Sequence, residues 1–183
     1  MTDVLKTPRS ADEVSNAVHG DCPVYLYSDL VRCMKEKGAF RVLKWLFHKS
    51  LKMIILVQDP RDMNKGHWVS LSMNPRMNTI YFFSSYGGKP DVEKNEWISH
   101  DDLIKSNQDA NVLNDGMKQF AKLGWEVHYN EFPYQIVGDK TATCGIWCVA
   151  FLNSDMNPTE FGVFNKQHNL TANDYFEAYF KKE

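Results

Sequence analysis

The sequence lacks the features that mark membrane, secreted and repetitive proteins. No apolar run approaches the roughly 20 residues that a membrane-spanning helix needs, and residues 1–6 lack the apolar core of a signal peptide. Four cysteines are too few for a disulfide scaffold in a chain of 183 residues, so we expect a protein of a reducing compartment that is not secreted. Without internal repeats or low-complexity linkers, residues 1–183 are interpreted as one domain.

Charge of either sign is not in excess. The 21 lysines and arginines nearly balance the 23 acidic residues, giving a formal net charge of −2. Such a chain has no general positive field for phosphates, so nucleic acid is not an expected requirement. The alternative is a local basic patch at Lys44, Lys49 and Lys52 that binds nucleic acid. Hydrophobic residues make up 43% of the chain, which is typical of an ordinary globular protein with a substantial core.

The cysteines do not form a convincing metal-binding pattern. Cys22 and Cys33 lack the spacing of zinc ligands. Cys144 and Cys148 could supply half of a zinc site, but the apolar residues around them argue against it. We therefore expect neither a metal ion nor another cofactor.

The most informative stretch is residues 141–152, which starts polar and ends as an unbroken apolar run. Residues 146–152 are all apolar, which is typical of a helix buried on every side. We expect the hydroxyl of Thr143 to cap this helix and Cys144 to be its first residue. Residues 138–143, which lead into the helix, are expected to be flexible.

Cys144 is interpreted as a nucleophile because of its place in this helix. At the positive end of the helix dipole, a cysteine favours the thiolate over the thiol. A buried structural cysteine is the alternative interpretation, and it suits Cys148, one turn further into the apolar run. Gly145 carries no side chain that would block the approach of a substrate backbone.

A β-hairpin is predicted over residues 66–73 and 79–83, because the first segment alternates and turn-forming residues separate the two. His67 begins the first strand and Ser84 ends the second. The two residues should therefore lie at the same end of the hairpin. A lone histidine is more often structural than catalytic, but its place at a strand edge favours a role in a site.

The remaining pattern mixes helices with strands. Helices are expected over residues 10–20, 28–38, 39–49, 112–123 and 171–180, and further strands over residues 53–57 and 125–129. The charged stretch 89–109 is predicted to be a surface loop.

The order of these motifs resembles a known family of proteases. Gly-His-Trp at 66–68 is followed by Asn-Pro-Arg-x-x-Thr-x-Tyr-x-Phe, Tyr-Gly, Gln135 and then Cys-Gly-x-x-Cys at 144–148. This order is similar to that of the adenovirus maturation protease. More widely, it looks like the clan of SUMO- and ubiquitin-like-protein proteases, which includes proteases of virophages and other large DNA viruses. The resemblance covers residues 67–152, about half of the chain.

The resemblance implies an α+β fold, the papain-like or adenain-like cysteine protease fold. Its central mixed sheet packs against a buried helix that carries the nucleophile. By the same resemblance His67 is the general base, Cys144 is the nucleophile and Gln135 is an oxyanion donor acting with the backbone N–H of Cys144. Trp68 matches the tryptophan that follows the histidine, and Trp68 and Gly145 are expected to contact substrate.

One position departs from the family pattern. The family places a carboxylate that orients the histidine just after the second hairpin strand, where this chain has Ser84. Ser84 could orient His67 through a neutral hydrogen bond or a water molecule. Alternatively, a carboxylate of the following segment, such as Asp91 or Glu93, could fold back and replace the missing acid.

The function implied by the resemblance is cysteine endopeptidase activity on viral structural precursors during particle maturation. The protein would then act in the cytoplasm or nucleus of an infected cell, or inside the virion. Its partners would be a polypeptide substrate and a peptide activator, without a membrane. The alternatives are a protease that removes a ubiquitin-like modifier, an acyltransferase that uses the same cysteine, and a catalytically weak binding module.

Overall fold

The centre of the fold is a five-stranded sheet in the order β1-β2-β3-β4-β5. The computed structural model describes residues 3–137 and 141–181. The strands are β1 (Val24–Leu26), β2 (Lys52–Asp59), β3 (Asp62–Asn74), β4 (Thr79–Ser84) and β5 (Glu126–Tyr129). Strands β2, β3 and β4 are antiparallel, whereas β1 and β5 join the two edges in parallel. The predicted hairpin is confirmed as β3 and β4.

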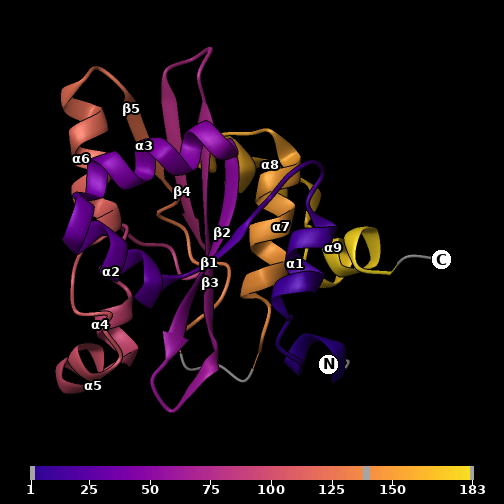
Figure 1. The fold of residues 1–183 in the computed structure, drawn as a ribbon. Helices are drawn as coiled ribbons and strands as arrows, with labels where there is room; N and C mark the ends of the chain where they lie inside the picture. The colour runs from indigo at the N-terminus through magenta and orange to yellow at the C-terminus, as the bar shows by residue number, and fades with distance from the viewer. Residues whose placement is uncertain (1–2, 138–140, 182–183) are drawn as a thin grey trace.

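Helices cover both faces of this mixed sheet (Figure 1). One face packs against α2 (Tyr27–Lys37), α3 (Ala39–Lys49) and α6 (Val112–Lys122). The other packs against α1 (Ala11–Ala17), α7 (Cys144–Ser154), α8 (Pro158–His168) and α9 (Ala172–Tyr179). Shorter helices are η1 (Asp3–Lys6), α4 (Lys94–Trp97) and α5 (His100–Lys105). The α+β class is confirmed, with the helix that carries Cys144 against the sheet.

Strand β2 shows why the central run is apolar on consecutive residues. Its alternate side chains Met53, Ile55 and Val57 belong to the core under α2, α3 and α6. Ile54 and Leu56 point the other way, into the core under α7. A strand buried on both faces reads as a continuous hydrophobic run, so the prediction of a buried strand here is confirmed.

Helix α7 lies at the centre of the second core. Its residues 144–152 are all buried, as the unbroken apolar run predicts. Thr143 precedes the helix, but its backbone is helical, with φ −96° and ψ −3°, and its side chain makes no cap hydrogen bond. The predicted hydroxyl cap is wrong, because a capping side chain needs an extended backbone at that position.

The prediction of a surface loop over residues 89–109 is wrong. This segment contains α4 and α5 and buries Asp91, Glu93 and Lys94. Asp91 accepts hydrogen bonds from the hydroxyl of Tyr27 (2.6 Å) and the backbone N–H of Asn114 (2.8 Å). Charged residues are buried only when they have partners, and here the partners come from distant parts of the chain.

Two helices differ from the sequence predictions in other ways. Helix α2 begins at Tyr27, before the cap expected at residues 28–29, and Leu26 ahead of it provides no side-chain cap. Helix α8 was not anticipated, although Asn157 and Glu160 form a capping box at its start. None of the described helices is long and apolar enough to cross a membrane.

Candidate active site

A cavity of about 320 Å³ lies where strand β3, the start of α7 and the loop before α7 meet. Of the residues that the sequence singles out, His67, Trp68, Gln135 and Cys144 line this cavity. They come from segments far apart in the sequence, so the fold brings together what the motif order suggested. Within the described part of the chain, Ser84 and Gly145 lie outside the lining of the cavity.

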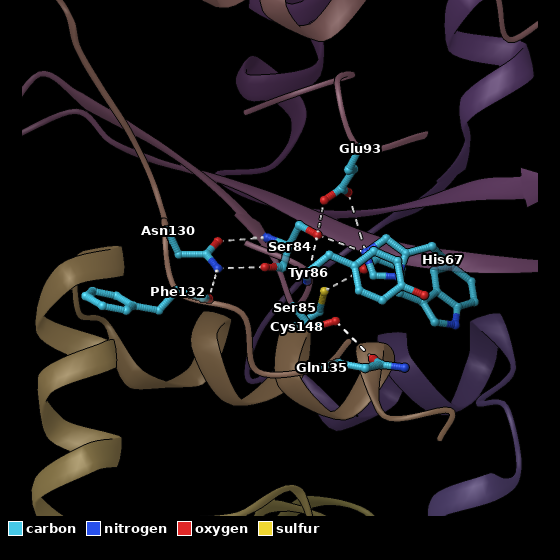
Figure 2. A network of polar contacts seen from close by, with 10 residues as sticks. His67, Ser84, Ser85, Tyr86, Glu93, Asn130, Phe132, Gln135 and Cys148 are labelled. Atoms are coloured by element: carbon cyan, nitrogen blue, oxygen red, sulfur yellow. Dashed lines mark hydrogen bonds and ion pairs between the residues drawn. The ribbon is translucent and has the colours of Figure 1, made fainter. Parts of the chain in front are cut away.

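His67 is buried, with a hydrogen-bond partner at one ring nitrogen and none at the other among the described residues. It is only 2% exposed, and its ring stacks on the ring of Tyr86 with centroids 3.8 Å apart. Its Nε2 lies 2.9 Å from the Oγ of Ser84 (Figure 2). Its Nδ1 is buried and has no hydrogen-bond partner among the described residues. Such a buried nitrogen is unusual and points to a chemical role.

Ser84 connects His67 to a buried carboxylate. The Oγ–H of Ser84 donates to Oε2 of Glu93 at 2.5 Å, while Oε1 of Glu93 lies 3.5 Å from Nε2 of His67. Figure 2 shows this chain of contacts from Glu93 through Ser84 to the imidazole ring. The two alternatives for orienting the histidine therefore occur together, Ser84 in contact with the ring and Glu93 behind it. Asp91 instead contacts Tyr27.

Asn130, just after β5, fixes the end of strand β4. Its Oδ1 accepts the backbone N–H of Ser84 at 3.0 Å, and its Nδ2 donates to the carbonyl oxygen of Ser84 at 2.6 Å. Nδ2 also donates to the carbonyl oxygen of Phe132 at 3.0 Å (Figure 2). Sequence reasoning missed Asn130, because a single asparagine after a strand is typical of an ordinary turn.

Cys144 is the first residue of α7, yet it is only 7% exposed. Burial raises the pKa of its thiol to about 11, although hydrogen bonds from the backbone of Trp68 and Gly145 act in the opposite direction. Burial also lowers the pKa of His67 to about 3. Both shifts favour the neutral forms, a thiol on Cys144 and an uncharged imidazole on His67. Burial therefore acts against the thiolate that the place of Cys144 at the helix start favours, and the resting thiolate stays a prediction.

Gln135 is buried with a fixed amide orientation. Its Oε1 accepts hydrogen bonds from the hydroxyls of Ser85 (3.1 Å) and Thr143 (3.3 Å). Its Nε2 donates to the carbonyl oxygen of Thr141 at 2.9 Å. Because both hydroxyls bind the oxygen, the donor nitrogen is directed to the loop just before Cys144. Nε2 carries a second N–H, which leaves Gln135 one donor beyond its bond to Thr141.

Gly145 allows close packing of the start of α7, and its contact with substrate stays a prediction. A Cβ at this position would lie 2.9 Å from Cγ1 of Val14 and 3.1 Å from Cδ1 of Trp68. A side chain would therefore collide with α1 and with the indole ring. Trp68 lines the cavity and donates its Nε1–H to the carbonyl oxygen of Arg9 at 3.1 Å.

The segment before α1 forms one wall of the cavity. Pro8 and Arg9 contribute to the lining, and the backbone N–H of Ala142 donates to the carbonyl oxygen of Leu5 at 2.8 Å. The lining also includes Gln135 and Thr141. Of the stretch 138–143 that was predicted to be flexible, residues 138–140 lie outside the described residues.

All four cysteines are free thiols. In the described ranges, no group of three or more His, Cys, Asp or Glu side chains could hold a metal ion. Cys144, His67 and Gln135 bring a thiol, an imidazole and an amide to the lining of the cavity.

Comparisons with known proteins give partial similarities. No family model matches the chain. A stretch of 86 residues is 38% identical to an uncharacterised protein of the Sputnik virophage. That match covers 47% of this chain and 46% of the virophage protein, so the chain spans less than half the length of the curated relative it matches.

Solved structures of the SUMO protease Ulp1 are similar at low identity. The C-terminal Ulp1 protease domain in complex with Smt3, the yeast orthologue of SUMO, has a TM-score of 0.42 and 14% identity, covering 85% of this chain and 72% of that chain. Ulp1 with its catalytic cysteine oxidised to a sulfonic acid has a TM-score of 0.39 and 14% identity, covering 82% and 67%.

Proposed function

We propose that this protein is a cysteine peptidase in which Cys144 attacks the peptide carbonyl and His67 is the base. The observation that carries the proposal is the state of the imidazole ring. When Glu93 is ionised, the hydroxyl of Ser84 gives it its single proton, so Nε2 of His67 must supply the proton in the next hydrogen bond. The neutral ring then keeps a lone pair on the buried, unpartnered Nδ1, in a residue that shares its cavity with Cys144.

The first chemical step transfers a proton and forms a bond. As Sγ of Cys144 attacks the carbonyl carbon of the scissile peptide, its proton moves to Nδ1 of His67 and the C=O electron pair moves onto oxygen. When the tetrahedral intermediate collapses, the C–N bond breaks and the leaving amine takes the proton from Nδ1. A water molecule then attacks the thioester carbonyl and gives a proton to Nδ1 of His67. The C–S bond breaks, the carboxylic acid leaves, and Sγ of Cys144 takes the proton back from Nδ1 as the thiol is regenerated.

Because burial favours a neutral thiol in the empty cavity, the proton of Cys144 moves to His67 at the same time as sulfur attacks the carbonyl carbon. Burial raises the pKa of Cys144 and lowers that of His67, so a separated thiolate and imidazolium are disfavoured in the empty cavity. General-base catalysis by a neutral histidine suits this starting state. The charge that then develops on the ring and the oxyanion needs nearby partners.

Gln135 is proposed as a donor to the oxyanion, together with the backbone N–H of Cys144. The two hydroxyls that bind Oε1 of Gln135 hold its Nε2 beside the loop that leads to the nucleophile. A donor fixed in advance needs little reorganisation when the negative charge forms, which is the basis of oxyanion stabilisation.

We further propose that the substrate is a polypeptide and, more narrowly, a viral structural precursor. Support for the virus comes from the resemblance of the motif order to viral proteases and from the partial identity with a virophage protein. Removal of a ubiquitin-like modifier would use the same residues and is the alternative to be tested beside it. The proposed setting is a reducing compartment of an infected cell, or the virion.

A substrate panel tests the proposal. Purified wild-type protein would be incubated with viral structural precursors, ubiquitin-like modifier fusions and an acetyl donor with acceptor peptides. Mass spectrometry would map the cuts. We expect specific peptide-bond cleavage that Cys144→Ala abolishes and that the matched control Cys148→Ala retains. Acetyl transfer without cleavage, or cleavage that persists in Cys144→Ala, would contradict the proposed peptidase.

A further inference from the structure

The hydrogen-bond partner of Nε2 of His67 is the hydroxyl of Ser84, and Oε1 of the carboxylate that binds this hydroxyl lies 3.5 Å from the same nitrogen. The Oγ of Ser84 is 2.9 Å from Nε2 of His67 and 2.5 Å from Oε2 of Glu93. It also accepts the backbone N–H of Tyr86 at 3.2 Å. A hydroxyl has one proton to donate and two lone pairs that accept, so it can connect its two side-chain neighbours in either direction.

These contacts allow two complete arrangements of protons. With Glu93 ionised, Nε2–H of His67 donates to Ser84, and Ser84 donates to Glu93. With Glu93 protonated, Glu93 donates to Ser84, and Ser84 donates to Nε2 of His67. Tyr86 donates to Ser84 in both cases. The first arrangement leaves the lone pair on Nδ1, whereas the second puts the ring proton on Nδ1.

We propose that Glu93 is a positioning residue that acts through the hydroxyl of Ser84, and that its charge decides which ring nitrogen of His67 carries the proton. Only ionised Glu93 then leaves Nδ1 able to accept the proton of Cys144. An ionised carboxylate bound directly to Nε2 can only accept a hydrogen bond, whereas the hydroxyl of Ser84 can accept or donate one. The inference rests on the proposed peptidase function and adds a regulating group to the same site.

The surroundings of Glu93 place this change near neutral pH. Burial raises the pKa of Glu93 to about 7, the bond from Ser84 lowers it, and the negative charges of Glu96 and Asp91 raise it further. The nearby cation of Lys94 is turned away, since its Nζ donates to the carbonyl oxygen of Asp91 and to Oδ1 of Asn111. His67 stays neutral because burial lowers its pKa.

Activity measurements on Glu93 and Ser84 variants test the proposal. In the wild-type protein kcat should rise with pH through a step near pH 7. Glu93→Gln should remove that step and lower kcat above it by on the order of 10²- to 10⁴-fold, as expected for a wrong tautomer, with KM little changed. The matched control Glu96→Gln removes an exposed charge that raises the pKa of Glu93, so it should keep the step and move it to lower pH.

A rescue variant separates positioning from mere structural support. Adding Ser84→Asp to Glu93→Gln puts a carboxylate directly beside Nε2 of His67. We expect it to recover most of the lost kcat and to move the pH step downward. A structural role for Glu93 would leave the double variant as inactive as Glu93→Gln, or worse. That result, together with a wild-type pH step that survives in Glu93→Gln, would overturn the proposal.

A second readout does not depend on activity. Nitrogen-15 NMR of the His67 ring, assigned by comparison with His67→Gln, reports which ring nitrogen carries the proton. We expect the proton to move from Nδ1 to Nε2 as the pH rises through about 7, and to show no such change in Glu93→Gln. One unchanged tautomer across this range would refute the switch. A normal tautomer change in a protein without peptidase activity would refute only the proposed function.

Discussion

The ring of Tyr86 lies flat on the imidazole ring of His67, with an interplanar angle of 11° and centroids 3.8 Å apart. The contact restrains the imidazole on its face, while Ser84 restrains it at the Nε2 edge. A general base must keep one orientation to accept a proton along a short path, so both contacts bear on the rate.

Replacing the aromatic ring should lower the rate of the chemical step. Aromatic pairs contribute about 0.5–1.5 kcal/mol beyond burial, so Tyr86→Leu should reduce kcat by up to about tenfold. Tyr86→Phe keeps the ring and should stay close to the wild type. Steady-state kinetics on a peptide substrate would measure both, and equal losses in the two variants would show that stacking has no part in the effect.

Alkylation of Cys144 should be slow at neutral pH and should speed up as the pH rises. Its pKa is raised to about 11 by burial, and only the thiolate reacts with iodoacetamide. Cys33 is the more exposed thiol and should be labelled first, so a Cys33→Ser background is the appropriate protein. Peptide mapping by mass spectrometry gives the order. Rapid labelling of Cys144 at mildly acidic pH would contradict the neutral thiol and support the thiolate predicted from the helix dipole.

Removal of the Gln135 amide should affect the transition state more than substrate binding. Gln135→Ala should lower kcat by roughly 10²- to 10³-fold with little change in KM, as for other oxyanion donors. Ser85→Ala leaves the amide in place and removes one of its two hydroxyl partners, so its loss should be much smaller. An unchanged kcat in Gln135→Ala would remove this residue from the site.

Glu93 should make the folded protein less stable as the pH rises. Its pKa is raised from 4.5 to about 7, so the folded chain binds the proton more tightly than the unfolded chain. Wild-type stability should therefore fall between these pH values, by up to about 3 kcal/mol, and the full loss should remain at higher pH. Relative to the wild type, Glu93→Gln should gain stability over the same window.

Urea unfolding from about pH 5 to about pH 8 checks this expectation for Glu93→Gln, with Glu96→Gln as the matched exposed control. His67 has the opposite effect on how stability varies with pH. Its pKa is lowered by burial from 6.5 to about 3, so its neutral form supports the fold above pH 6.5 and that support is lost as the pH falls through this range. A stability difference between Glu93→Gln and wild type that does not vary with pH would refute the linkage.

Duplex DNA should not activate the peptidase. Of the three lysines that could form a basic patch, Lys52 is engaged elsewhere, because its Nζ donates to the carbonyl oxygen of Leu152 at 2.6 Å. Lys44 and Lys49 remain on α3, with Lys49 near the ring of Trp45. Adding DNA at low salt should leave kcat/KM nearly unchanged. A large stimulation that salt abolishes, and that Lys44→Ala with Lys49→Ala reduces, would contradict this.

The sequence allowed prediction of those features that depend on local pattern. The hairpin, the buried strand β2 and the apolar helix α7 follow from periodicity and continuous hydrophobic runs. The order of the His67, Gln135 and Cys144 motifs suggested that they meet, and they do line one cavity. Their proposed chemical roles remain predictions.

The segment around Glu93 could not be read in the same way. Charged residues near Lys94 are typical of a solvated surface. No local pattern shows that Asp91 is buried against the distant Tyr27, or that Glu93 folds back onto Ser84. The pKa of Cys144 also depends on distant packing. Its place at a helix start is visible in the sequence, whereas the burial that raises its pKa depends on the packing of the whole domain.

The contact between Leu5 and Ala142 has a consequence for the synthesis of the protein. A ribosome makes the segment near Leu5 early, His67 later and Cys144 later still, and the cavity needs all three. A nascent chain therefore cannot hold an assembled site until α7 has emerged and packed against the sheet. An incomplete nascent chain would thus be unable to cleave itself or other proteins through the proposed site.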